Sequence, residues 1–271
     1  MEYNIRPLSF AEILDRSFRV LVDNALLLIG IAAIVCIPER AVLLLAVRFQ
    51  LIVLLAILSA SPLLHAALTT AVANIYLGRP VSIASAYRSA WSIILPFFGT
   101  YLLVYVLIGL IFGGLILLTT VAASAGLPGL IVVLGFIAAV PLLFYLMIRW
   151  SLIGPIMIVE RRFGLSAIRR SRDLVEGVWW RTLGIILVAG VVVQIPVSAL
   201  SFFWSSIPVL GVILSGLATS IAAAYSAVAV IVYYFDRRCR LEDFDLRLLA
   251  EQIRSESVQG SPAMTGAPSL D

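Results

Sequence analysis

The sequence has few of the residues on which soluble proteins and most enzymes depend. Its 271 residues include no lysine, one histidine and two cysteines, and charged residues make up only 13% of the chain. A lone histidine and scattered single carboxylates argue against a paired acid–base site or a metal-ligand set, and no nucleotide-binding loop is present. We therefore expect no enzyme activity, no cofactor and no metal site. We attribute the absence of lysine to genome composition.

The two cysteines do not support a disulfide framework. Cys36 lies in an apolar stretch, and Cys239 lies in a basic segment near the C-terminus. Because the two thiols fall in different places and one of them is expected in a reducing compartment, we do not expect a disulfide framework.

Long apolar stretches are what the sequence has instead. Hydrophobic residues make up 62% of the chain and the mean hydropathy is +1.10, far outside the range of soluble domains. A helix needs about 20 apolar residues to cross a bilayer core of roughly 30 Å. The pattern predicts an all-α integral membrane protein, a bundle of six transmembrane helices near residues 25–47, 51–77, 93–122, 129–150, 182–204 and 209–235.

The distribution of arginine predicts the orientation. Short arginine-rich loops stay on the cytoplasmic side, so both termini are expected there. We ascribe the net charge of +4 to this topology and to attraction by anionic phospholipid, and we expect no nucleic-acid partner, because no basic groove with interleaved aromatic residues is present. Sixteen of the nineteen arginines lie in four cytoplasmic segments: 6, 16 and 19; 79 and 88; 161, 162, 169, 170, 172 and 181; 237, 238, 240, 247 and 254.

The cytoplasmic segments are predicted to form amphipathic helices. The first, near residues 9–22, begins with a capping box of Ser9 and Glu12, and its apolar stripe is expected to lie in the headgroup boundary. Similar helices are expected near 82–91 and 165–180. Each of the three precedes two apolar spans, which suggests a threefold repeat of interfacial helix plus transmembrane hairpin. A fourth helix is expected near 241–254 and a disordered tail over 255–271.

Three stretches carry a resemblance to a known family. They are residues 164–181 (GLSAIRRSRDLVEGVWWR), 6–19 (RPLSFAEILDRSFR) and 234–246 (YFDRRCRLEDFDL). Together they resemble the bacterial family named for the membrane domain of glycerophosphoryl diester phosphodiesterases. The resemblance implies a membrane domain standing alone in the bacterial plasma (inner) membrane. In family members that hydrolyse glycerophosphodiesters, the activity belongs to a separate soluble barrel, for which this chain has no room.

Polar residues inside the apolar spans are the candidate functional residues, because a polar or charged group at membrane depth is costly. Glu39 could bind a proton or cation, or it could lie at the outer surface if the first span ends near Pro38. His65 could relay protons or hydrogen-bond a neighbouring helix. Arg149 could pair inside the bundle or extend to a headgroup phosphate. Gln194 is expected to satisfy carbonyl groups freed by a nearby proline.

Small residues predict how the spans pack. Gly109 and Gly113 form a GxxxG step in the third span, and the sixth span is rich in glycine, alanine and serine. Such residues let helix backbones approach closely. We expect these residues to pack the spans of one chain against one another in a closed bundle; the alternative is a homodimer face.

Two functions follow from these features. The first is a non-enzymatic membrane scaffold or accessory subunit, with a possible membrane or cytoplasmic protein partner. Its arginine-rich face would contact anionic lipid through Arg161, Arg162, Arg169, Arg170, Arg172 and Arg181. The alternative is a small transporter or permease with a polar site near Glu39, His65 and Arg149. A water-accessible cavity lined by these three residues would favour transport.

Overall fold

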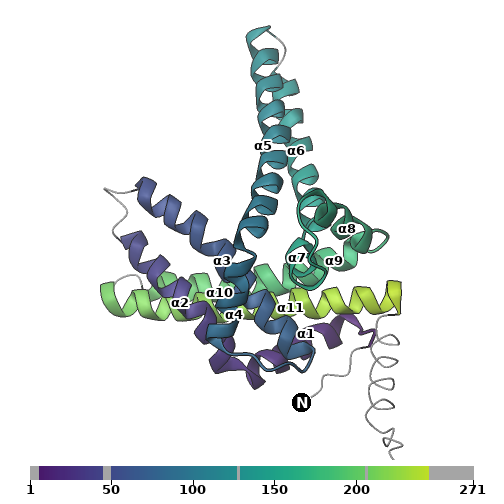
Figure 1. The fold of residues 1–271 in the computed structure, drawn as a ribbon. Coiled ribbons are helices and arrows are strands. Elements are labelled where there is room, and N and C mark those ends of the chain that lie inside the picture. The colour runs from purple at the N-terminus through teal and green to yellow at the C-terminus, as the bar shows by residue number, and fades with distance from the viewer. Residues whose placement is uncertain (1–5, 45–49, 127–128, 205–206, 244–271) are drawn as a thin grey trace, which may run out of the picture.

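The computed structural model describes residues 6–44, 50–126, 129–204 and 207–243, and every regular element in this part of the chain is a helix (Figure 1). In chain order the helices are α1 (Phe10–Asp23), α2 (Ala25–Leu44), α3 (Gln50–Tyr76), α4 (Ile83–Ser92), α5 (Ile94–Ser124), α6 (Gly129–Arg149), α7 (Ile153–Val159), α8 (Leu165–Val175), α9 (Trp179–Ile186), the π-helix η1 (Leu187–Val192), α10 (Val193–Trp204) and α11 (Pro208–Glu242).

Several of these helices have the length and composition of membrane spans. Four helical stretches qualify: Ile94–Val121, Val133–Val159, Trp179–Trp204 and Val209–Glu242. The pair α1 and α2, bent by 84°, would add a fifth if it were counted as one broken span. The all-α class is therefore confirmed, and the chain fits a multi-pass membrane protein. Six crossings and the threefold repeat stay predictions.

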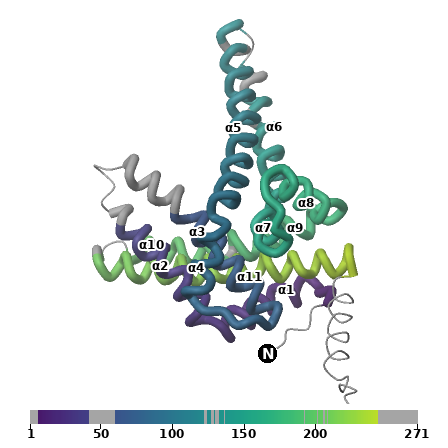
Figure 2. Tube along the Cα trace, viewed as in Figure 1, coloured from purple at the N-terminus to yellow at the C-terminus, as the bar shows by residue number. Residues whose placement is uncertain are grey.

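The helical hairpins diverge from a common base. α5 and α6 pack along each other and rise away from the other helices, whereas α10 lies beside α11 and runs in a different direction (Figures 1 and 2). α11 is the central element of the base, because it packs against α1, α2, α3 and α10. The closed bundle that we expected from the small residues is thus not confirmed by the described helices.

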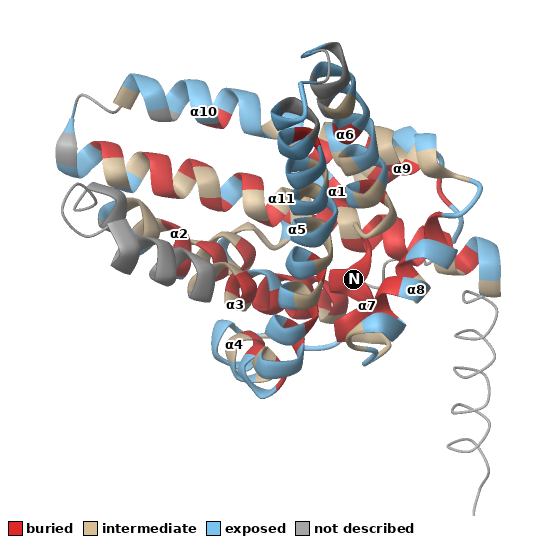
Figure 3. Ribbon diagram, turned by 90° about the horizontal axis from the view of Figure 1, so that it is seen from above, coloured by how far each residue is buried: buried red, intermediate tan, exposed pale blue. Residues whose placement is uncertain are grey.

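The packed core lies at this base. Figure 3 shows buried residues gathered along α3, α7 and the second half of α11, whereas α5 and α10 are mostly exposed. Tyr233, Tyr234 and Phe235 of α11 are at most 1% exposed, and they are among the largest side chains of the core. The α5 span, by contrast, is only 11% buried. Its apolar surface needs an apolar solvent, and hydrocarbon chains of a bilayer provide one.

Small residues let α11 pack closely against α2, whereas the glycines of α5 face open space in the described part of the chain. A Cβ added at Gly216 would lie 2.8 Å from Cγ1 of Ile37, so the two backbones are in close contact there. A Cβ added at Gly109 or Gly113 would meet nothing within 4 Å in the part of the chain that the structure describes. The intramolecular packing predicted for this GxxxG step is therefore not seen, because the α5–α6 hairpin diverges from the base.

α1 begins as the sequence predicts and then packs differently. The Ser9 hydroxyl accepts the Glu12 N–H and the Glu12 carboxylate accepts the Ser9 N–H, which completes the capping box. Ile13 and Leu21, both from the predicted apolar stripe, are buried against the protein, whereas Phe18 is 59% exposed. Only part of the stripe thus remains for the headgroup boundary, because α11 packs on the rest.

The other predicted cytoplasmic helices differ in length. α4 begins after Ser82, which forms a second capping box with Ser85. α8 ends at Val175 instead of continuing to 180, because Gly177 takes a positive φ of 76° and α9 begins afresh at Trp179. α11 continues unbroken to Glu242. Most of the predicted helix 241–254, and all of the predicted tail 255–271, lie outside the described residues.

Candidate functional site

The C-terminal end of α11 delivers a row of charged side chains to the base of the protein. Asp236 and Arg240 are four residues apart on the helix, as are Arg238 and Glu242, so each pair lies on one face and forms an ion pair at 3.0 Å. These residues follow directly on the buried aromatic cluster of the core. The charges are therefore held at the edge of a rigid apolar core.

Asp236 is the most deeply buried charge of this row, with a side chain that is 0% exposed. Its Oδ1 accepts the Leu8 N–H at 2.7 Å and the Arg240 Nε–H at 3.0 Å. Nη2 of Arg181, from α9, lies 3.1 Å from Oδ2, close enough for an ion pair. Among the described residues, no donor is aligned for a hydrogen bond with Oδ2. A buried carboxylate is tolerated here because two guanidinium groups flank it.

The same residues hold the chain that leads into α1. The Leu8 carbonyl oxygen accepts hydrogen bonds from Arg181 at 2.6 Å and from Arg240 at 2.7 Å. Both backbone polar groups of Leu8 are thus bound, and its side chain is 1% exposed. We call Leu8, Arg181, Asp236 and Arg240 the N-terminal clamp. The clamp joins α9 and α11 to a residue that is 228 positions away from Asp236.

A second cluster lies on the other side of α11 and is centred on Glu160, the C-cap of α7. Its carboxylate accepts Nε–H of Arg170 at 3.0 and 3.1 Å and the hydroxyl of Tyr234 at 2.9 Å. Arg170 also pairs with Glu242. Because Glu242 in turn pairs with Arg238, the cluster ties α7 and α8 to the end of α11. We call these five residues the Glu160 cluster.

Two further contacts join α11 to α8 and α9. Nε of Arg237 donates to the carbonyl oxygen of Leu174 at 2.8 Å, at the end of α8 where carbonyl groups lack helical partners. The hydroxyl groups of Thr182 and Tyr233 lie 2.6 Å apart and are buried. The polar residues at this end of α11 are therefore committed to the protein itself.

The six arginines predicted to contact lipid headgroups fall into two groups. Arg170 and Arg181 are drawn into the Glu160 cluster and the N-terminal clamp. The other four are exposed around the α7–α8 connection: Arg161, Arg162, Arg169 and Arg172. Two of these four have weak pairings, Arg162 at 3.4 Å from Glu160 and Arg172 at 3.7 Å from its neighbour Asp173. Most of the charge in this group thus faces outward.

The four candidate residues of the spans are not brought together. Glu39 is half-buried on α2 and follows Pro38, while the next residue, Arg40, donates to Thr219 of α11 at 3.0 Å. His65 lies on the exposed surface of α3, so its side chain points away from the core. No hydrogen bond or ion pair joins any two of the four within the described ranges.

The remaining two candidates are Arg149 and Gln194. Arg149 is the last residue of α6, and its guanidinium lies over the ring of Tyr145, 5.2 Å from the centroid, at the end that meets the base. Gln194 is exposed and is the second residue of α10, which follows the π-helix η1. There, Ser226 of α11 donates to the carbonyl oxygen of Ala189 at 2.8 Å. A serine of the neighbouring helix therefore supports this irregular backbone.

The described residues hold no group of three or more His, Cys, Asp or Glu side chains arranged to bind a metal ion. The arrangement at the base consists of arginines, carboxylates and hydroxyl groups that bind one another. These ion pairs and hydrogen bonds hold the helices together. The exposed guanidinium groups outside them are able to bind anions.

Sequence reasoning missed the N-terminal clamp and the role of Glu160. The available signals were local: an aspartate placed among arginines at the end of the last apolar stretch, and a single glutamate at the end of the fourth. Neither signal reveals its partner, because the contacts join segments that are far apart in the chain.

Comparison with known proteins identifies the family. The family model described as "Domain of unknown function (DUF8558)" matches residues 36–260, and the chain belongs to this family. No curated protein and no solved structure matches the chain. The matched range includes the Glu160 cluster and three residues of the N-terminal clamp, whereas Leu8 precedes it.

Proposed function

We propose that this member of the DUF8558 family is a non-enzymatic membrane scaffold or accessory subunit whose arginine-rich base contacts anionic phospholipid. In this proposal the chain crosses the bacterial plasma membrane six times, and the base and both termini are cytoplasmic. α3 provides one of these crossings, because it has 27 residues and no charged side chain.

The division of the arginines is the observation that carries the proposal. The base commits arginines to its own carboxylates and carbonyls, yet the α7–α8 connection and α8 keep two exposed arginines each. Arg161 and Arg169 make no ion pair with any described residue. Each basic residue near an anionic membrane surface contributes about 1 kcal/mol. Four such residues between positions 161 and 172 favour a surface of negative charge.

Exposed tryptophans support this placement. Trp180, the second residue of the span that follows the arginines, is 79% exposed, and Trp91 near the end of α4 is 69% exposed. Indole rings favour the boundary between headgroups and hydrocarbon. In the proposal, these tryptophans and the exposed arginines lie where the protein leaves the bilayer.

The transporter alternative gains no support from the geometry. Its proposed site needed Glu39, His65 and Arg149 around one cavity, but no hydrogen bond or ion pair joins these residues in the described part of the chain, and His65 is exposed. The resemblance to glycerophosphodiesterase membrane domains adds no chemistry, because that activity belongs to a separate domain. The scaffold role leaves room for a protein partner at the membrane.

Lipid retention tests the proposal. The full chain is purified in mild detergent, equal amounts of phosphatidylglycerol and phosphatidylcholine are added, and bound lipid is measured by native mass spectrometry. Changing Arg161, Arg162, Arg169 and Arg172 to glutamine is expected to lower phosphatidylglycerol retention by about tenfold or more. Changing the same four to lysine keeps the charge and is the matched control. Equal retention by the glutamine and lysine variants would refute the proposal.

A further inference from the structure

Aromatic rings hold Arg149 where two predicted spans meet the base. Arg149 is the last residue of α6, and its guanidinium lies over the ring of Tyr145, with Cζ 5.2 Å from the centroid. One of its N–H groups donates to the Tyr145 hydroxyl. The Tyr145 ring stacks on Trp179 at 6.3 Å between centroids, and Trp179 meets the edge of Trp180 at 4.7 Å. The three rings therefore join the end of α6 to the start of α9.

The backbone that carries this guanidinium is fixed as well. Ser171 of α8 is buried, and its hydroxyl donates to the Arg149 carbonyl oxygen at 2.8 Å and accepts the Leu152 N–H at 3.3 Å. The bond satisfies one of the last carbonyl groups of α6, which have no partner within the helix. The Arg149 side chain thus starts from an anchored helix end, and the Tyr145 ring and hydroxyl restrict its rotation. An anion meets a preorganised group here.

The guanidinium keeps hydrogen-bond donors for a further partner. The bond to Tyr145 uses one of its five N–H groups, and Arg149 forms no ion pair with any described residue. The nearby Arg170 and Arg181, by contrast, both pair with carboxylates of the protein. The planar fork of a guanidinium fits two oxygens of a phosphate group. The remaining donors of Arg149 therefore suit a phosphate.

Exposed apolar side chains continue from Arg149 into both predicted spans. Leu142 and Tyr145 precede Arg149 by seven and four residues, so they share its face of α6, and each is 41% exposed. Trp180 and Leu187, seven residues apart on the next span, are 79% and 44% exposed. A free phosphate ion would use the guanidinium alone. A glycerophospholipid also covers the apolar side chains with its acyl chains, which favours the lipid as the occupant.

We propose that Arg149, Tyr145, Trp179 and Trp180 form a site for one glycerophospholipid, with its phosphate on the guanidinium and its acyl chains along the exposed faces of α6 and α9. The inference rests on the proposed placement of the base at the cytoplasmic surface of a membrane. The site binds the phosphate that these lipids share, so it requires no net negative charge on the lipid. In this it differs from the exposed arginines of the proposed function, which attract anionic lipid.

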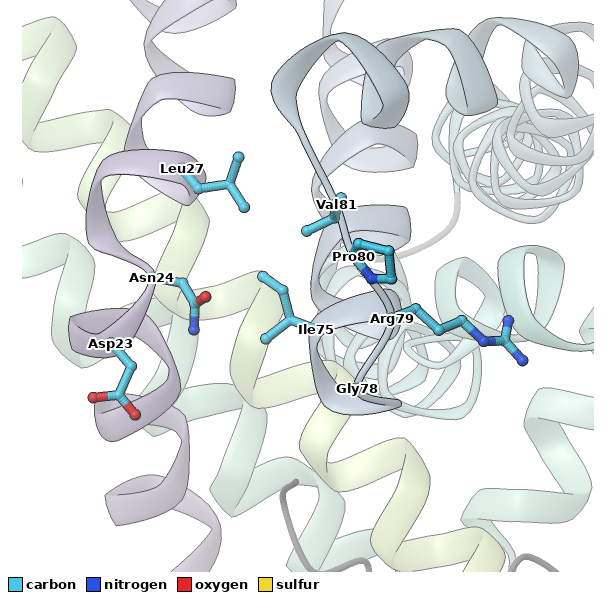
Figure 4. Close-up of a pocket in the computed structure, with 8 residues that line it drawn as sticks. All are labelled: Asp23, Asn24, Leu27, Ile75, Gly78, Arg79, Pro80 and Val81. Atoms are coloured by element: carbon cyan, nitrogen blue, oxygen red, sulfur yellow. The ribbon is translucent and has the colours of Figure 1, made fainter. Parts of the chain in front are cut away.

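Arg79 provides the matched control. It follows the end of α3, at the same proposed boundary, and borders a pocket of about 580 Å³ between the α1–α2 corner and the α3–α4 loop. Figure 4 shows that its side chain points away from the space between the two walls. Arg79 makes no cation–π contact and no ion pair with any described residue. Its replacement removes the same charge from the same boundary and leaves the aromatic rings beside Arg149 intact.

Lipid competition on the full chain tests the inference. Phosphatidylcholine, which has no net charge, and a diacylglycerol with the same acyl chains, which has no phosphate, are added in equal amounts to the purified protein. Bound lipid is measured by native mass spectrometry. We expect phosphatidylcholine to be retained about tenfold better, and Arg149→Gln to abolish this preference while Arg79→Gln keeps it. An excess of inorganic phosphate should leave the lipid bound; its displacement by inorganic phosphate would overturn the assignment to a lipid.

A second variant covers the case in which Arg149→Gln does not fold. Tyr145→Phe keeps the ring but removes the hydroxyl that Arg149 binds, and it should lower the preference about threefold. The inference would be overturned by a wild-type chain without the preference, by a preference unchanged in both variants, or by an equal loss in Arg79→Gln. Phosphatidylglycerol retention by the four-arginine variant is a separate readout, so the proposed function and this site can each stand if the other fails.

Discussion

Replacing Asp236 by asparagine tests whether the N-terminal clamp holds the base together. The side chain is 0% exposed and lies 3.0 Å from Arg240 and 3.1 Å from Arg181. Asparagine keeps the shape and an oxygen for the Leu8 N–H, but it removes the charge that both arginines face. Breaking a buried ion pair from one side costs about 3–5 kcal/mol. Because Arg181 and Arg240 are 26% and 36% exposed and can recruit water, we expect the lower end, about 3 kcal/mol.

The assay is reversible unfolding in mixed micelles, followed by circular dichroism as denaturing detergent is added. Asp15→Asn is the matched control, since the Asp15–Arg19 pair is four residues apart on α1 and 58–71% exposed. An exposed pair contributes less than about 1 kcal/mol, so the control should unfold almost like the wild type. If the two variants unfolded at the same detergent fraction, the clamp would not contribute as argued.

A double-mutant cycle separates the pair from the rest of the clamp. Asp236→Asn and Arg181→Gln are made singly and together, and the free energies of unfolding are compared. If Arg181 acts mainly through Asp236, the double variant should be less destabilised than the sum of the two single variants. Additive effects would show that Arg181 stabilises the base only through the Leu8 carbonyl.

Two further predictions concern close packing and pH. Gly216→Ala should destabilise the chain by about 1–3 kcal/mol in the same assay, because the new Cβ would lie 2.8 Å from an α2 side chain. Gly113→Ala meets open space and should be neutral or slightly stabilising; equal losses at both positions would contradict the close contact at Gly216. The Ser9 N–H, then the Arg6 guanidinium, lower the pKa of Glu12 to about 2. Its contribution to stability is therefore complete above pH 4.5 and is lost as the pH falls toward 2. Carbon NMR of labelled glutamate should give this low midpoint, and Arg6→Gln should raise it; a midpoint near 4.5 in the wild type would refute the capping geometry.

Local signals in the sequence predict much of the fold. Ser9 with Glu12 marks the start of α1, and Ser82 marks the start of α4, because capping depends on residues three positions apart. The apolar stretches likewise predict helices of membrane length, since each helix satisfies its own backbone. The candidate arginines between residues 161 and 181 are found in the same way, from the composition of the segment between two apolar stretches.

The remaining features depend on contacts between distant segments. Leu8 and Asp236 are 228 residues apart, and nothing near either one indicates the other. Arg170 and Arg181 look like their exposed neighbours in sequence, yet each pairs with a carboxylate of another element. The sequence also does not indicate that the α5–α6 hairpin points away from the other helices. Lipid-facing and protein-facing surfaces are both apolar in a membrane helix, so the sequence does not distinguish them.

Reporter fusions at successive turns test the six-crossing topology most directly. Fusions of a periplasm-active and a cytoplasm-active enzyme are placed after Gly78, Gly126, Gly164, Ile207 and Asp243. The account predicts that these positions alternate, with Gly78, Gly164 and Asp243 in the cytoplasm and Gly126 and Ile207 outside it. A reporter after Gly164 that is active only outside the cytoplasm would contradict the orientation and remove the basis for the lipid contacts of the arginine-rich base.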